Sequence, residues 1–91
     1  MLEIEVEGIP CLFDDAALND FEMLEHLANF KKGDVTHMVP FALGIFGEEQ
    51  LDNIKSQLRS DDGVVKITDM GRFIGEAMEK ASEAKKAESK N

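Results

Sequence analysis

Two histidines and a single cysteine are the side chains of this sequence best suited to catalysis or metal binding. His26 and His37 fall on different predicted helices, and no H-x-x-x-H or C-x-x-C spacing accompanies either of them. We therefore expect both imidazoles to be exposed to solvent. Cys11 stands in an apolar segment with no basic neighbour that would favour a thiolate, so we expect a small buried side chain rather than a nucleophile.

Two acidic pairs and one glycine-containing segment are the other places where chemistry could reside. Asp14-Asp15 and Asp61-Asp62 lack the D-x-D-x-D-G pattern of a calcium-binding loop, and turns or helix caps account for both pairs. Residues 44–47, Gly-Ile-Phe-Gly, lack the Lys and Ser/Thr of a phosphate-binding loop. We therefore expect no catalytic residue, no cofactor and no metal. The sequence predicts a protein that acts by binding, not an enzyme.

The charge of the chain is strongly negative and unevenly distributed. The net charge is −9, and the first 30 residues hold eight acids and no Lys or Arg, whereas residues 31–91 are nearly balanced. Direct binding to nucleic acid needs a basic surface, so we do not expect it. The acidic N-terminal third leaves one alternative open, an interaction protein that mimics DNA and inhibits a nucleic-acid-binding protein of a host.

The sequence carries no sign of export or membrane insertion. No run of apolar residues is long enough to span a membrane, and the first residues lack the basic and apolar regions of a signal peptide. A single cysteine cannot form an intramolecular disulfide. We expect a cytoplasmic protein that does not contact membranes.

The N-terminal residues show the pattern of a β-hairpin over residues 1–13. Residues 2–7 alternate apolar and acidic side chains, which is the period of a strand with one buried face. Glu7-Gly8 can turn the chain, and a second strand can return with Pro10 limiting it to an edge. A lone hairpin is marginal in water, so we expect it to pack on helices or to pair with another chain.

Helices are predicted for most of the remaining chain. Apolar spacing, caps and glycines place them at about residues 19–32, 35–46, 48–60 and 69–84, and the polar residues 85–91 should fray. The expected fold is mainly α: a small bundle of about four helices with an N-terminal β-hairpin, or α+β by strict counting. We expect a single compact domain over residues 1–84.

The beginnings of the first two helices carry specific expectations. Asn19 precedes Glu22 by three residues, the spacing of a capping box, so we expect Asn19 to cap the first helix. Pro40 lies too deep for an undistorted helix that begins after Asp34. Either that helix kinks at Pro40, or a turn at residues 35–38 precedes a helix that starts near Val39 with Pro40 at its first position. We favour a kinked or two-part helix that ends at Gly47. The apolar stripe expected to face the core from the first helix is Phe21, Leu24, Leu27 and Ala28.

Residues 38–46 form the only segment that is apolar all round, so it must be covered on every side. Most of it should be the core of the bundle. Near the break at Pro40, Met38 and Phe41 are expected to remain partly exposed as a contact point for a partner. Leu2 and Ile4 lie on a strand that could add to a partner's sheet. Met38, Phe41, Leu2 and Ile4 are therefore the candidate partner-binding residues.

Three segments together resemble the small tail assembly chaperones of long-tailed bacteriophages (siphoviruses) and prophages. Residues 19–25 resemble the acidic D-[FW]-E-x-L-E helix of that family, residues 44–51 a helix end with G-E-E-Q, and residues 58–65 the segment before a final amphipathic helix. The similarity covers about residues 18–80. This sequence has Phe21 where many relatives have Trp, and Pro40 interrupts its middle helix.

The resemblance implies a non-catalytic protein that binds the long helical tape measure protein, keeps it soluble and helps to recruit tail tube protein. It implies that the protein acts in the cytoplasm of the bacterial host and is absent from the mature virion. A homo-oligomer is compatible with this role. Such chaperones are often also made as a longer −1 frameshift product. Ser89-Lys90-Asn91 can be encoded by the slippery sequence A-AAA-AAC, and Lys85-Lys86 marks a second candidate position.

Overall fold

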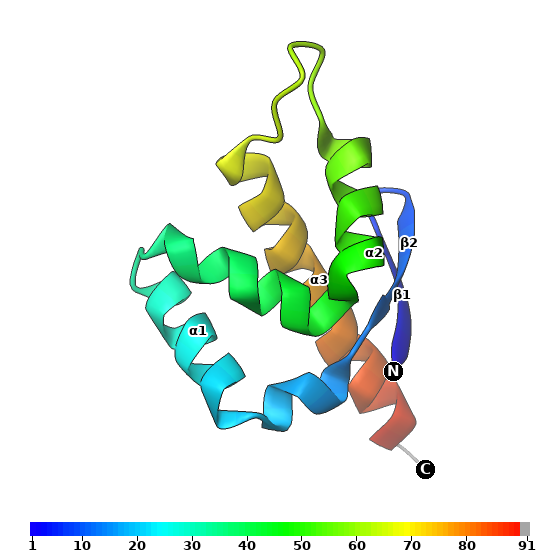
Figure 1. The fold of residues 1–91 in the computed structure, drawn as a ribbon. Helices are drawn as coiled ribbons and strands as arrows, with labels where there is room; N and C mark the ends of the chain where they lie inside the picture. Colours follow the sequence, from blue (N-terminus) through cyan, green and yellow to red (C-terminus); the bar gives the residue numbers. More distant parts are fainter. Residues whose placement is uncertain (90–91) are drawn as a thin grey trace.

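The fold combines one β-hairpin with three α-helices (Figure 1). The structure is a computed structural model that describes residues 1–89, with side chains to residue 87. The mainly helical fold with an N-terminal hairpin is therefore confirmed. The strands are β1 (Leu2–Val6) and β2 (Ile9–Phe13), and the α-helices are α1 (Phe21–Lys31), α2 (Met38–Leu58) and α3 (Ile67–Ser89). Two short 3-10 helices, η1 (Asp15–Asn19) and η2 (Val35–His37), precede α1 and α2.

The hairpin forms as its alternating pattern predicts. β1 and β2 are antiparallel, with Leu2 opposite Phe13 and Val6 opposite Ile9. Glu7 and Gly8 both adopt positive φ (52° and 79°), which is the backbone twist that closes a two-residue hairpin. The hairpin does not stand alone, because β1 packs along α3 and β2 packs against α2. One face of the hairpin is thus buried by the helices.

The first α-helix turns a different face to the core from the one predicted. Met23 is buried and Leu27 is partly buried, whereas Phe21 and Leu24 are 73% and 55% exposed. The prediction of an inward Phe21–Leu24 stripe is therefore wrong: this helix carries apolar side chains on two faces, and periodicity alone does not choose between them. The N-cap is also one residue later than predicted, because the Asp20 carboxylate accepts the backbone N–H of Glu22 (2.8 Å).

The second α-helix bends at Gly47 and not at Pro40. Asp34 caps η2, and α2 begins only at Met38, so Pro40 falls in its first turn, where a missing N–H breaks no helical hydrogen bond. The favoured kink at Pro40 is therefore wrong, and the alternative in which a turn precedes the helix is closer, although Pro40 is the third residue of α2 and not the first. Gly47 has φ 78° and ψ 163°, which divides α2 into two segments that run in different directions (Figure 1). These segments correspond to the predicted helices 35–46 and 48–60.

The side chain of Gln50, three residues after this bend, ties α2 to the hairpin. Its amide accepts the backbone N–H of Leu12 (2.7 Å) and donates to the Leu12 carbonyl (2.9 Å), as a neighbouring strand would do at this edge of β2. The same amide donates to the Phe46 carbonyl (2.8 Å). The Gln of the G-E-E-Q segment thus has a structural role that sequence reasoning missed, because its partner lies 38 residues away.

Replacing Gln50 with alanine is expected to destabilise the fold by about 1.5–2 kcal/mol. Three hydrogen bonds are lost, and at this partly exposed site each contributes near the lower end of the usual range of about 0.5–1.5 kcal/mol. Urea unfolding followed by circular dichroism measures the change. Gln57→Ala, at an exposed position of the same helix, is the matched control and should change the free energy of unfolding by less than about 0.5 kcal/mol. Equal effects of the two substitutions would contradict the role of Gln50.

The last α-helix is longer than predicted. It spans Ile67–Ser89 instead of about 69–84, so the prediction that the chain frays from residue 85 is wrong as far as residue 89. One reason is a long-range ion pair, in which the ammonium of Lys85 lies 2.6 Å from the carboxylate of Asp15. The remainder of the predicted tail, Lys90 and Asn91, lies outside the described residues.

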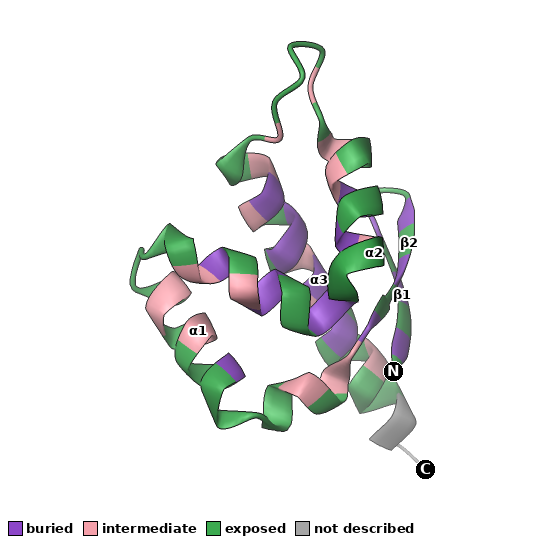
Figure 2. Ribbon diagram, viewed as in Figure 1, coloured by how far each residue is buried: buried purple, intermediate pink, exposed green. Residues whose placement is uncertain are grey.

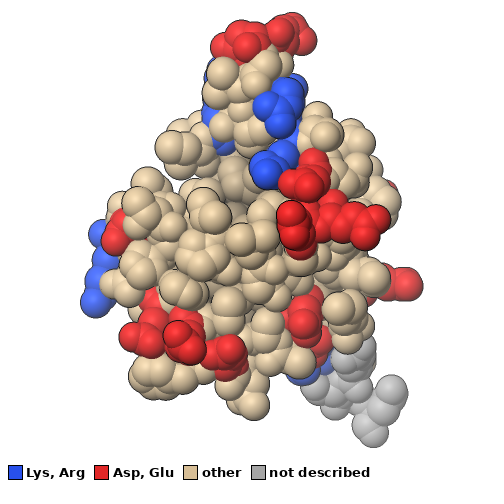
Figure 3. Space-filling model, viewed as in Figure 1, with Lys and Arg blue, Asp and Glu red and all other residues tan. Residues whose placement is uncertain are grey.

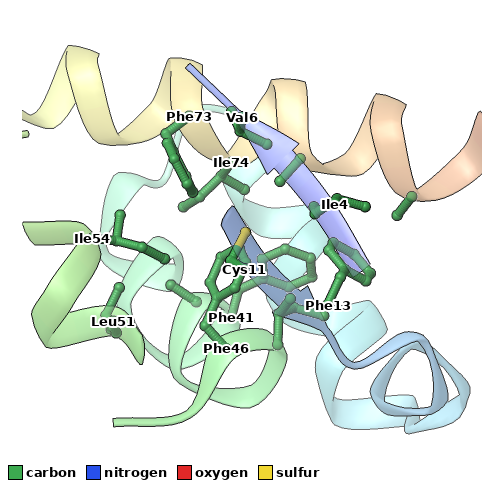
Figure 4. Close-up of a cluster of buried hydrophobic side chains, with 14 of the residues drawn as sticks. Ile4, Val6, Cys11, Phe13, Phe41, Phe46, Leu51, Ile54, Phe73 and Ile74 are labelled. Atoms are coloured by element: carbon green, nitrogen blue, oxygen red, sulfur yellow. The ribbon is translucent and has the colours of Figure 1, made fainter. Parts of the chain in front are cut away.

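One apolar core joins both strands and the three α-helices (Figure 2). Its centre is a row of three aromatic rings, one each from β2, α2 and α3. Phe13 and Phe46 meet edge to face with ring centroids 6.1 Å apart, and Phe46 meets Phe73 at 6.0 Å (Figure 4). Within the described residues no polar or charged residue is buried. The stability of this core therefore depends on packing and not on a buried polar network.

Candidate partner-binding surface

The four residues that the sequence singled out for partner binding are all buried. Met38, Phe41, Leu2 and Ile4 are 6%, 1%, 4% and 8% exposed. The expectation that Met38 and Phe41 remain partly exposed is therefore wrong, because the chain is regular through Pro40 and bends only at Gly47. Leu2 and Ile4 face the helices, so they are not free to contact a partner.

A groove lies where the two segments of α2 meet the beginning of α3. Its volume is about 240 Å³, and Met38 contributes to its wall although it is nearly inaccessible. In Figure 3 the surface is hollowed between the start of α3 and the second segment of α2, within a face whose centre carries few charged side chains. The lining residues are Met38, Val39, Ala42, Leu51, Lys55, Val65, Ile67 and Met70.

Two apolar side chains at the rim of this groove are largely open to solvent. Val39 and Ile67 are each 60% exposed, and they come from different helices, α2 and α3. Lys55 is the one charged residue in the lining, and its ammonium lies 3.2 Å from the carboxylate of Asp52. A concave apolar surface with an accessible apolar rim suits the apolar face of an amphipathic helix.

The groove could not be found from periodicity. Its floor belongs to the core, and Val39 and Ile67 lie 28 residues apart in the sequence. The one indication of the groove in the sequence is that Val39 lies beside the core positions of an apolar segment. An apolar residue there is either buried on a second side or left exposed, and the sequence does not distinguish the two.

A second apolar surface lies on the outward face of α1. Phe21 and Leu24 stand one helical turn apart and are both exposed, with Ala28 one further turn along. This surface belongs to a single helix, whereas residues of both α2 and α3 line the groove. It therefore presents apolar area without the enclosed shape of the groove.

Several N-terminal acids are paired within the molecule. The carboxylate of Glu7 lies 3.0 Å from the guanidinium of Arg72. Asp15 bonds to Lys85, and this hydrogen bond lowers the pKa of the Asp15 carboxyl. Glu3 and Glu5 lie on the exposed face of β1. These pairs leave fewer free acids for a DNA-like surface than the sequence count implies.

The residues first considered for chemistry occupy two different environments. Cys11 is buried in the core, as predicted, and burial raises the pKa of its thiol. His26 and His37 are not the isolated exposed imidazoles that were expected. Their Nδ1 atoms lie 2.9 Å apart, and both rings are partly buried. No local sequence pattern indicates this contact, because it joins α1 to the end of η2 across a turn.

Comparisons with known proteins identify no relative. A scan of protein-family models, a search of curated proteins and a search of solved structures each found no match to this chain. No helix within the described residues is long and apolar enough to cross a membrane. Over the same part of the chain, no group of three or more His, Cys, Asp or Glu side chains is placed to hold a metal ion. The shape and chemistry of the surface are therefore the structural guide to function.

Proposed function

We propose that this protein is a non-catalytic tail assembly chaperone of a long-tailed bacteriophage or prophage, which binds the tape measure protein and helps to recruit tail tube protein. The resemblance of residues 18–80 to that family supports this assignment. The structural observation that carries it is the apolar groove between α2 and α3, with Val39 and Ile67 exposed at its rim. The proposed setting is the cytoplasm of the bacterial host.

The groove suits this role because a tape measure protein is a long helical chain. An amphipathic helix taken from it would place apolar side chains over Val39 and Ile67, which removes apolar surface of both proteins from water. The net charge of −9 keeps the chaperone soluble while this surface is exposed. No group in the groove other than Lys55 is charged, so little desolvation of charge opposes binding.

Placing charges at the rim tests the binding site. In the double variant Val39→Glu, Ile67→Glu, a bound apolar helix would bury two unpaired carboxylates, so the complex should be lost. Both positions are exposed, so the variant should still fold. The measurement is the soluble fraction of a tape measure protein co-expressed with each chaperone variant. The tape measure protein for this experiment is expressed from the very long gene that we expect downstream of the gene for this chain.

The matched control is Phe21→Glu, Leu24→Glu, which adds the same two charges to the other apolar surface. Tape measure protein should remain soluble with this control and should aggregate with the groove variant. The opposite result would place the binding surface on α1. If the unaltered chain gives no more soluble tape measure protein than an empty vector, the chaperone function itself is refuted.

A further inference from the structure

The rings of His26 and His37 contact each other through their Nδ1 atoms. The rings approach with centroids 5.2 Å apart and an interplanar angle of 42°, and the Nδ1 atoms are 2.9 Å apart. In the metal-free protein one imidazole donates its Nδ1–H to the lone pair of the other. The side chain of His37 is 30% exposed, so ions and water in the solvent reach the pair.

A carboxylate lies on the far side of one of these rings. The Oδ2 of Asp34 is 3.5 Å from the Nε2 of His37. The other oxygen, Oδ1, accepts hydrogen bonds from the hydroxyl and the backbone N–H of Thr36, which hold the carboxylate in this position. A carboxylate beside Nε2 favours the proton on that nitrogen, which leaves the Nδ1 of His37 with a free lone pair.

We propose that His26 and His37 form a two-nitrogen chelate for a divalent transition-metal ion such as Zn²⁺ or Ni²⁺, and that Asp34 orients the His37 ring. This proposal is independent of the chaperone function. The absence of a recognised spacing motif led to the expectation of no metal site, but the fold brings together two ligands that lie 11 residues apart. Imidazole nitrogen suits these ions.

The separation of the two nitrogens fits a shared ion. With metal–nitrogen bonds of about 2.0–2.1 Å, the two nitrogens lie about 2.9 Å apart for a right-angle chelate and about 3.3 Å apart for a tetrahedral one. The observed 2.9 Å falls at the right-angle end of this range. In the metal-free arrangement the two Nδ1 atoms face each other directly, as a hydrogen bond requires, so each ring must turn by about 35–45° for both lone pairs to meet at the ion. His26 moves its proton from Nδ1 to Nε2, and water completes the coordination.

Such an ion would connect α1 to η2 and thereby fix the corner before the groove-forming helix α2. Because the ion would bind the folded arrangement of the two rings, it should raise the midpoint of thermal unfolding. Mg²⁺ prefers oxygen ligands and should have no such effect at the same concentration.

The test uses protein without a histidine tag, titrated with ZnCl₂ or NiCl₂ and followed by calorimetry and thermal unfolding. We expect one ion per chain, and loss of this binding in His26→Gln and in His37→Gln. Asp34→Asn retains a good helix cap and should weaken binding by about 10–100-fold. Both glutamine variants keep Cys11 and the N-terminal amine, so they also control for binding at those groups.

If a glutamine variant fails to fold, NMR of the unaltered chain tests the site directly. Nitrogen-15 NMR of the histidine rings with Zn²⁺ should show both Nε2 atoms carrying a proton and both Nδ1 atoms without one, with the Nδ1 resonances at the positions of metal-bound nitrogen. Coordination through Nε2, binding of equal strength in folded glutamine variants, or no binding at millimolar metal would each overturn the site.

Discussion

Phe73→Ala is expected to destabilise the protein by about 3–5 kcal/mol, the range for removing a fully buried aromatic side chain. Phe73 is 0% exposed and stands at one end of the row of rings that connects α3 to α2 and β2. The substitution leaves a cavity and removes the edge-to-face contact with Phe46. Urea unfolding should show a much lower midpoint.

Phe21→Ala is the matched control, since it removes the same atoms from a ring that is 73% exposed. Its effect on the free energy of unfolding should stay within about 0.5 kcal/mol. Both substitutions remove the same side-chain atoms, so the difference between their effects on the free energy of unfolding reports the burial of Phe73. A loss below about 1 kcal/mol in Phe73→Ala would mean that α3 does not pack on the hairpin and α2 as described.

The hairpin and the end of α1 each depend on a few neighbouring residues, and both were predicted from the sequence. The hairpin follows from the alternation of residues 2–7 and from Glu7-Gly8, whose positive φ values a two-residue turn requires. The end of α1 follows from Gly33, which has φ 105°. In each case the signal and the structure lie within the same few residues.

The parts that were missed depend on contacts between distant residues. The inward face of α1 is decided by Gly44, which lacks a side chain and so leaves room for Met23 close to α2. The extra length of α3 is favoured by the Lys85–Asp15 pair, which lies 70 residues apart in sequence. Neither partner is visible from a local pattern.

The candidate binding residues were missed for a related reason. Residues 38–46 were expected to be covered on every side, but Val39 and Leu43 are 60% and 42% exposed. The expected break was also placed at Pro40. Once the break lies at Gly47, Met38 and Phe41 point into the core, and Val39 and Leu43 are left exposed. The position of one backbone bend therefore decides which apolar side chains are available to a partner.

Gly47→Ala tests the bend and is expected to destabilise the fold by about 1–3 kcal/mol. The backbone of Gly47 (φ 78°, ψ 163°) lies in a region that is essentially restricted to glycine. No atom lies within 4 Å of the Cβ that alanine would add, so the cost comes from backbone strain and not from a clash. Thermal and urea unfolding measure it.

Gly75→Ala provides the control, because this glycine is exposed within α3, its φ is not positive and its added Cβ also meets nothing within 4 Å. Alanine is the better helix former by about 1 kcal/mol, so this variant should be more stable than the unaltered chain. The same chemical change should thus have opposite signs at the two positions. If both variants are stabilised, Gly47 continues a regular helix, and the bend that orients Gln50 toward β2 and opens the groove beside Val39 is absent.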